Sequence, residues 1–155
     1  MRILLAIDGS PSSDAAVDEV CRRPWPAGSE VRLLTVLSPV EFSHLRQSSR
    51  QPMTYDDIFE KTGWKTVRFL VNALTEMEQR APDLAVTPVL LEGRPKDVIL
   101  DDAESWCPDL IVVGSHGYGK IRRFFLGSVS LAIALNATCS VEIVRCPSYC
   151  LDSEE

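Results

Sequence analysis

The sequence predicts an α/β fold in which one open five-stranded parallel sheet carries helices on both faces. Short continuous apolar runs, typical of strands covered on both sides, alternate along the chain with segments whose apolar residues recur at helical spacing. Strands that alternate with helices form parallel sheets, because each crossover packs a helix back onto the sheet.

The length and composition are those of one domain. The chain has 155 residues, of which 45% are hydrophobic and 25% charged, as in a soluble globular protein. We expect a single domain at residues 1–147 and an acidic tail at 148–155. No apolar run is long enough to span a bilayer, and the apolar stretch at the N-terminus is too short for a signal peptide. We therefore expect a cytoplasmic protein with no membrane partner.

The charge disfavours a nucleic-acid partner. The net charge is −6, whereas binding to a phosphate backbone needs clustered Lys and Arg. One short basic cluster lies at residues 120–123, and the five cysteines have no zinc-ligand spacing. We therefore predict neither nucleic-acid binding nor a zinc site.

The first strand and helix are predicted over the first 24 residues. Residues 3–7 form an apolar run, after which Ser10 suits a helix N-cap and Pro11 the first helical position. Apolar residues at helical spacing continue until Pro24, and a second strand follows at 31–37.

The middle of the chain combines an irregular segment with the clearest helix of the sequence. Residues 40–57 show no period, and a loop of that size is usually functional or disordered. The helix that follows ends before Pro82. Its predicted buried stripe consists of Val67, Leu70, Val71, Leu74 and Met77.

Three strands and two helices are expected in the remainder. The third strand is predicted at 84–91, and the helix that opens at 93–95 ends before Pro108. That helix is expected to bury Val98, Ile99, Ala103 and Trp106. The last elements are predicted as a strand at 110–113, a helix at 128–136 and a strand at 140–146.

Pro88 indicates the order of the strands in the sheet. It lies inside the third strand, and proline within a sheet is tolerated almost only at an edge. The strand order 3-2-1-4-5 puts the third strand at an edge, whereas the order 2-1-3-4-5 makes it central. The predicted fold is therefore Rossmann-like, with its switch point between strands 1 and 4, where ligands bind in open α/β sheets. Asp8 and Gly114 lie at the carboxyl ends of these two strands.

The loop from Gly114 to Ser130 has the features of an anion site. It leaves a buried strand and ends in a helix whose first turn is predicted at 127–130, where unpaired N–H groups favour negative charge. The hydroxyls of Ser128 and Ser130 are further donors. Neither familiar phosphate motif fits, because Ile121 replaces the hydroxyl residue of a Walker A loop and the dinucleotide pattern lacks its third glycine.

A third pattern does fit. Gly114, Gly117 and Gly127 are separated by two and nine residues, Ser128 follows directly, and Asp8 ends the first strand. This spacing resembles the ATP-binding branch of the universal stress protein family, and the resemblance covers about residues 1–146, including the element order.

The resemblance implies an adenine nucleotide as ligand, and specifically ATP. Because the phosphates carry several negative charges and the protein is acidic, we expect Mg²⁺ or Mn²⁺ to strengthen binding, held mainly by phosphates and water. It implies Ile7 and Asp8 beside the nucleoside, Val36 and Val113 beside the adenine, and His116 beside the phosphates. The residues that it implies around the phosphates are Gly114, Gly117, Gly127, Ser128, Val129 and Ser130.

Simpler explanations exist for the polar candidates. Asp8 could merely cap a turn, and His116 outside this motif would be read as a solvated loop residue. At the switch point we favour a ligand contact for both. The three tryptophans are better explained by packing than by base stacking, since they share no face.

No motif places a catalytic residue. The G-x-S-x-G elbow of serine hydrolases is absent, and no second acid is placed to hold a metal or orient a water. Three hypotheses remain: an ATP-dependent regulatory switch, a slow ATPase or self-phosphorylating protein, and an interaction protein that no longer uses nucleotide. We favour the first, and at most weak hydrolysis.

The fifth strand at 140–146 would be the far edge of the sheet. Val141, Ile143 and Val144 make that edge apolar and β-branched, so it would pair without control unless it is used. We expect a two-fold homodimer in which two such strands pair antiparallel, and the resemblance implies the same. The alternative is a monomer whose edge is shielded by Pro147 and the tail.

Overall fold

A computed structural model describes residues 1–38, 55–117 and 126–146. Four helices and five strands alternate within these ranges. In chain order they are β1 (Arg2–Ala6), α1 (Pro11–Arg22), β2 (Glu30–Leu37), α3 (Tyr55–Arg80), β3 (Ala85–Glu92), α4 (Pro95–Trp106), β4 (Leu110–Gly114), α5 (Ser128–Asn136) and β5 (Ser140–Val144). The tail expected at 148–155 lies outside the described residues.

The sheet is parallel throughout and has the order β3-β2-β1-β4-β5. This confirms the predicted topology. Pro88 pairs with Leu33 on the edge strand β3, whose outer side has no neighbouring strand in the sheet, so its missing N–H breaks no inner ladder.

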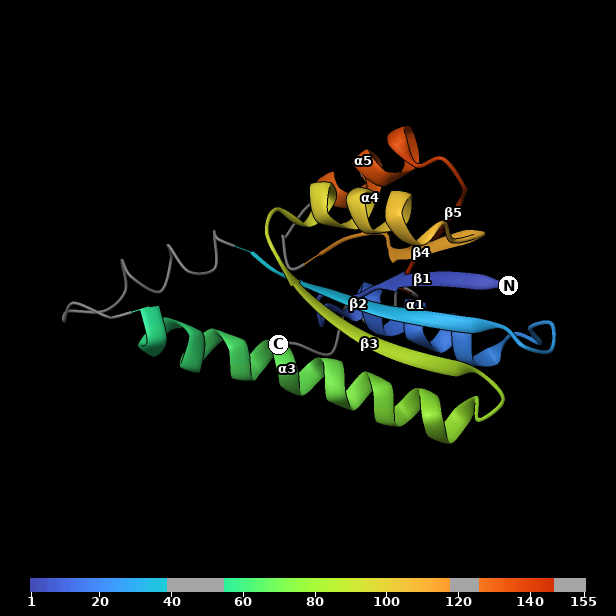
Figure 1. Ribbon diagram of the computed structural model, residues 1–155, viewed down its shortest axis with the longest axis horizontal. Helices are drawn as coiled ribbons and strands as arrows, with labels where there is room; N and C mark the ends of the chain where they lie inside the picture. Colours follow the sequence, from blue (N-terminus) through green and yellow to red (C-terminus); the bar gives the residue numbers. More distant parts are fainter. Residues whose placement is uncertain (39–54, 118–125, 147–155) are drawn as a thin grey trace.

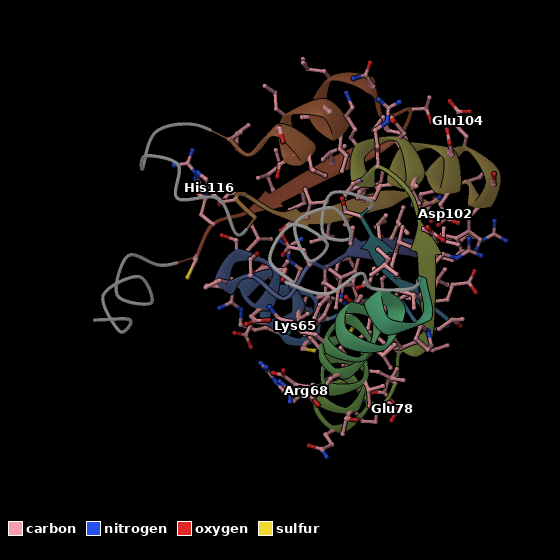
Figure 2. The ribbon with its side chains drawn as sticks, turned by 90° about the vertical axis from the view of Figure 1, so that its left-hand side faces the viewer. Lys65, Arg68, Glu78, Asp102, Glu104 and His116 are labelled. Atoms are coloured by element: carbon pink, nitrogen blue, oxygen red, sulfur yellow. The ribbon has the colours of Figure 1, made fainter. Side chains whose placement is uncertain are left out.

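Among the described residues, α1 and α3 cover one face of the sheet, and α4 and α5 cover the other (Figure 1). Alternate residues of β1 point to opposite faces. Ile3 and Leu5 pack into one core with α1 and α3, while Leu4 and Ala6 pack into the other with α4 and α5. Charged residues such as Arg68, Glu78 and Glu104 lie on the outer surfaces of the helices (Figure 2). The core is therefore two layers that sandwich β1 and β4.

The predicted stripe of α3 needs one correction. Leu70 and Met77 are buried, but Val71 is 50% exposed. A 3.6-residue period carries Val71 to the flank of the face that Leu70 presents to the sheet.

Several predicted boundaries also move. The helix α3 begins at Tyr55, so the last residues of the segment expected to be irregular at 40–57 are helical, while 39–54 lie outside the described residues. The strand β5 ends at Val144, two residues before its predicted end. Among the described residues, no helix is long and apolar enough to cross a bilayer.

Candidate functional site

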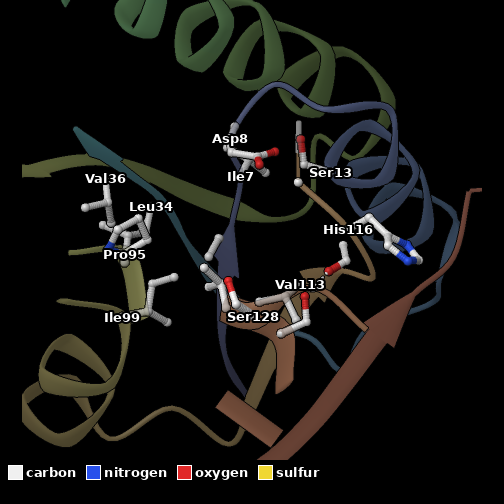
Figure 3. Close-up of a pocket in the computed structure, with 16 residues that line it drawn as sticks. Ile7, Asp8, Ser13, Leu34, Val36, Pro95, Ile99, Val113, His116 and Ser128 are labelled. Atoms are coloured by element: carbon white, nitrogen blue, oxygen red, sulfur yellow. Dashed lines mark hydrogen bonds between the residues drawn. The ribbon is translucent and has the colours of Figure 1, made fainter. Parts of the chain in front are cut away.

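A cavity of about 220 Å³ opens at the carboxyl ends of β1 and β4 (Figure 3). It lies at the predicted switch point, where the chain turns from β1 into α1 and from β4 into the loop that runs from Gly114 to Ser130, called the glycine loop below. The structure brings all eleven sequence-predicted residues to its wall. These are Ile7, Asp8, Val36, Val113, Gly114, His116, Gly117, Gly127, Ser128, Val129 and Ser130.

The turn after β1 places Asp8 just before the N-terminus of α1. Gly9 has φ +78°, a left-handed conformation that glycine adopts without strain. The Ser10 N–H donates to Asp8 Oδ1 at 2.9 Å, and Ser10 Oγ accepts from the Ser13 N–H at 3.3 Å as the N-cap of α1. Asp8 is thus fixed locally, as the simpler explanation required, and still borders the cavity.

Gly114 is required by packing. A Cβ on Gly114 would lie 2.6 Å from the Ser12 carbonyl carbon and 2.8 Å from the Ser13 nitrogen, both backbone atoms of α1. The sequence interpretation explained this glycine by the approach of a phosphate. The structure adds a different reason, which is close contact between β4 and the first turn of α1.

Gly117 and Gly127 are crowded by other parts of the site. A Cβ on Gly117 would lie 2.8 Å from Asp8 Oδ2, and one on Gly127 would lie 3.3 Å from the Ser115 carbonyl oxygen. The Gly127 N–H donates to that same oxygen at 2.8 Å. The two ends of the glycine loop are therefore held together by backbone contact.

The first turn of α5 lines the cavity with N–H groups. Those of Ser128, Val129 and Ser130 lack intrahelical acceptors because the helix begins there, and among the described residues no side chain caps them, since the N-cap is Gly127. The Ser128 side chain is exposed, whereas the Ser130 hydroxyl donates to the Gly114 carbonyl at 2.6 Å. Of the two hydroxyls expected to face an anion, that of Ser130 is thus committed to Gly114, whereas that of Ser128 has no hydrogen-bond partner among the described residues.

His116 borders the cavity, but its ring turns away from Ser128 (Figure 3). Ser115 Oγ lies 2.9 Å from His116 Nδ1, and Nε2 is buried with no partner among the described residues. The ring is therefore fixed by its neighbour on the side away from α5.

The opposite end of the cavity is apolar. Val36 lies there together with three further side chains that sequence reasoning missed, Leu34, Pro95 and Ile99, whereas Val113 lies beside Ser128 (Figure 3). Ala6 and Ser13 are also wall residues that were not predicted. Pro95 and Ile99 open α4, which follows the edge strand β3. The sequence signal for them was the helix start after β3, which does not reveal that this helix reaches the switch point.

Asp14, in the first turn of α1, lies near other carboxylates. Burial, together with the carboxylates of Glu76, Asp8 and Asp18, raises the pKa of Asp14 above its ordinary value of 3.8.

Among the described residues that line the cavity, Asp8 is the one with a formally charged side chain. Within the described ranges no three His, Cys, Asp or Glu side chains are grouped to hold a metal. The basic cluster at 120–123 lies outside these ranges.

Sequence comparison identifies relatives over nearly the whole chain. A model of the universal stress protein family matches residues 1–145. The universal stress protein Mb2019 of Mycobacterium bovis is 32% identical over 152 residues, which cover 94% of this chain and 44% of the relative. YxiE of Bacillus subtilis, also a universal stress protein, is 30% identical over 93% of this chain and 98% of its own. The chain therefore spans less than half of the first relative and almost all of the second.

Solved structures share the fold. MJ0577 superposes with a TM-score of 0.79 at 24% identity, covering 95% of this chain and 96% of its own. An Arabidopsis thaliana family protein with AMP bound gives 0.64 at 20% identity, covering 99% and 97%. A universal stress protein in complex with cAMP gives 0.66 at 21% identity, covering 95% and 98%. At these identities the likeness shows the fold.

Proposed function

This chain belongs to the universal stress protein family, and we propose that it binds ATP in the cavity between β1 and β4 and acts as a nucleotide-dependent switch in stress response. The observation that carries the proposal is the division of one cavity into an apolar end and an end lined by helix N–H groups. An adenine nucleotide has the same two parts, a flat apolar base and an anionic phosphate chain.

The apolar end suits the base. Its aliphatic surface favours a heteroaromatic ring that leaves water to bind there. This surface consists of Leu34, Val36, Pro95 and Ile99. Asp8 also lines the cavity, and its carboxylate can accept hydrogen bonds from ribose hydroxyls.

The other end suits the phosphates. The α5 macrodipole and the free N–H groups of its first turn favour an anion, and the Ser128 hydroxyl can donate to it. AMP and cAMP in two structural neighbours make adenine nucleotides the first ligands to test.

A divalent ion would arrive with the nucleotide. The described residues form no cage for it, so phosphates and water would supply most ligands to Mg²⁺ or Mn²⁺, as is usual for magnesium. We expect ATP to bind more weakly in EDTA than in excess Mg²⁺, and equal affinities in calorimetry would exclude a role for the ion.

Ser128→Asp tests the phosphate end. A carboxylate in the first turn of α5 suits the helix dipole, so the fold is retained, but it repels a phosphate at close range. We expect ATP affinity to fall by about tenfold or more in calorimetry. Ser128→Asn, which is neutral and of similar size, is the matched control and should lose much less. Equal affinities in the two variants contradict the assignment of the phosphates to α5.

The competing functions differ in what happens to bound ATP. A switch retains it, a slow ATPase releases ADP, and a self-phosphorylating protein gains a phosphate. The protein as purified should contain adenine nucleotide, and mass spectrometry of nucleotide and protein after incubation distinguishes the three. If the purified protein contains no nucleotide and also binds none that is added, the result supports an interaction protein that uses no nucleotide.

A further inference from the structure

The Ser10 hydroxyl connects two segments that are far apart in the sequence. Ser10 is 1% exposed, and its Oγ donates to the His116 carbonyl at 3.2 Å while it accepts from the Ser13 N–H at 3.3 Å. One hydroxyl therefore caps α1 and holds the glycine loop. The second contact is not needed to start the helix.

The contact with the loop fixes the direction of a backbone donor. The peptide between His116 and Gly117 is trans, so its C=O and N–H point in opposite directions. Because Ser10 holds the carbonyl on the α1 side, the Gly117 N–H points away from α1.

That N–H is available to a ligand. No described residue accepts it, and Gly117 lines the cavity. The Gly117 nitrogen lies 3.7 Å from the position of a Cβ on Gly127, so it is next to the N-cap of α5.

We propose that Ser10 is a positioning residue, which turns the Gly117 N–H toward the space in front of α5 so that it acts with the N–H groups of that helix on one anion. The identity of the anion as the phosphate chain of ATP rests on the proposed function. The orientation of the Gly117 peptide does not.

The chemistry at position 10 is demanding. The side chain must donate to a carbonyl, accept from an N–H and fit a fully buried site. Threonine retains the hydroxyl, whereas alanine removes both contacts. Ser10→Ala also weakens the cap of α1, so a stability control is needed. Val20→Ala removes buried volume at the other end of α1, away from the cavity wall, and serves that purpose.

The experiment follows the Gly117 amide by NMR of the ¹⁵N-labelled protein during titration with ATP and, separately, with inorganic tripolyphosphate. In the unmodified protein we expect the Gly117 signal to shift with both. In Ser10→Ala we expect the shift to be lost and the ATP affinity to fall about tenfold, the size of one hydrogen bond to a charged group. Ser10→Thr should restore both, and Val20→Ala should change neither.

The outcomes separate the two proposals. A Gly117 shift with tripolyphosphate that depends on Ser10 supports the positioning role even if ATP does not bind, in which case the proposed function fails alone. ATP binding without a Gly117 shift, or a shift that Ser10→Ala leaves intact, overturns the positioning role and leaves the proposed function standing. No response of Gly117 to either ligand also overturns it.

Discussion

At the scale of single residues, Gly114 lies where α1 and β4 touch. An alanine there would push its Cβ to 2.6 Å from the Ser12 backbone, which cannot rotate away as a side chain can. We expect Gly114→Ala to lower the free energy of unfolding by about 1–3 kcal/mol, as overpacking does. Gly127→Ala, whose Cβ would meet its nearest backbone atom at 3.3 Å rather than 2.6 Å, should cost less and is the comparison. Urea denaturation measures both, and equal losses contradict the packing explanation.

Asp14 makes the stability of the folded protein depend on pH. Its pKa is raised by burial and by the carboxylates of Glu76, Asp8 and Asp18, so folding favours the protonated form. Below pH 3.8 the group is protonated in both states and carries no penalty. As the pH rises through the raised pKa, ionisation costs the folded state more than the unfolded state.

Asp14→Asn should therefore be more stable, relative to the unmodified protein, at pH 7 than at pH 3. Urea denaturation of both proteins at the two pH values measures this difference. A relative stability that does not change, or that falls toward pH 7, is the contrary result.

At the scale of elements, the two sides of α3 should differ in how much their side chains contribute to the free energy of unfolding. Leu70 and Met77 are buried against the sheet, while Val71 is half exposed. We expect Leu70→Ala and Met77→Ala each to cost about 2–5 kcal/mol of unfolding free energy. Val71→Ala should stay within about 0.5 kcal/mol. A large loss in the Val71 variant would mean that this side of α3 is covered in solution.

At the scale of the whole molecule, β5 is one edge of the sheet (Figure 1). Val141 and Ile143 pack only partly against the core on the α5 side, and Leu135 of α5 is 74% exposed. An apolar edge of this kind favours association, and we propose an antiparallel pairing of two β5 strands.

Light scattering at micromolar concentration should then give twice the chain mass of 17.2 kDa. Ile143→Pro removes one backbone donor from β5 and should shift the equilibrium toward monomer if that donor faces the partner. A monomer for the unmodified protein rules the pairing out.

The fold and most residues of the cavity wall could be predicted from the sequence. Apolar runs and helical periods predicted the nine elements of the described residues in the right order, because both patterns depend on neighbouring residues. Pro88 ordered the strands, since its missing N–H is a property of one residue wherever it lies. The family resemblance, which the glycine spacing and Asp8 indicate, implied eleven residues that all line one cavity. That they bind a nucleotide remains a proposal.

The contacts that each of these residues makes could not be predicted from the sequence. The sequence could not show that Pro95 and Ile99 close the apolar end, that the Ser130 proton is committed to Gly114, or that Val71 faces outward. These facts depend on how far α4, α5 and α3 are rotated and shifted against the sheet, which is set by close packing between segments distant in the chain. A local period fixes a helix but not its position against its neighbours, and the Ser10 contact with His116, across 106 positions of sequence, exists only once that position is set.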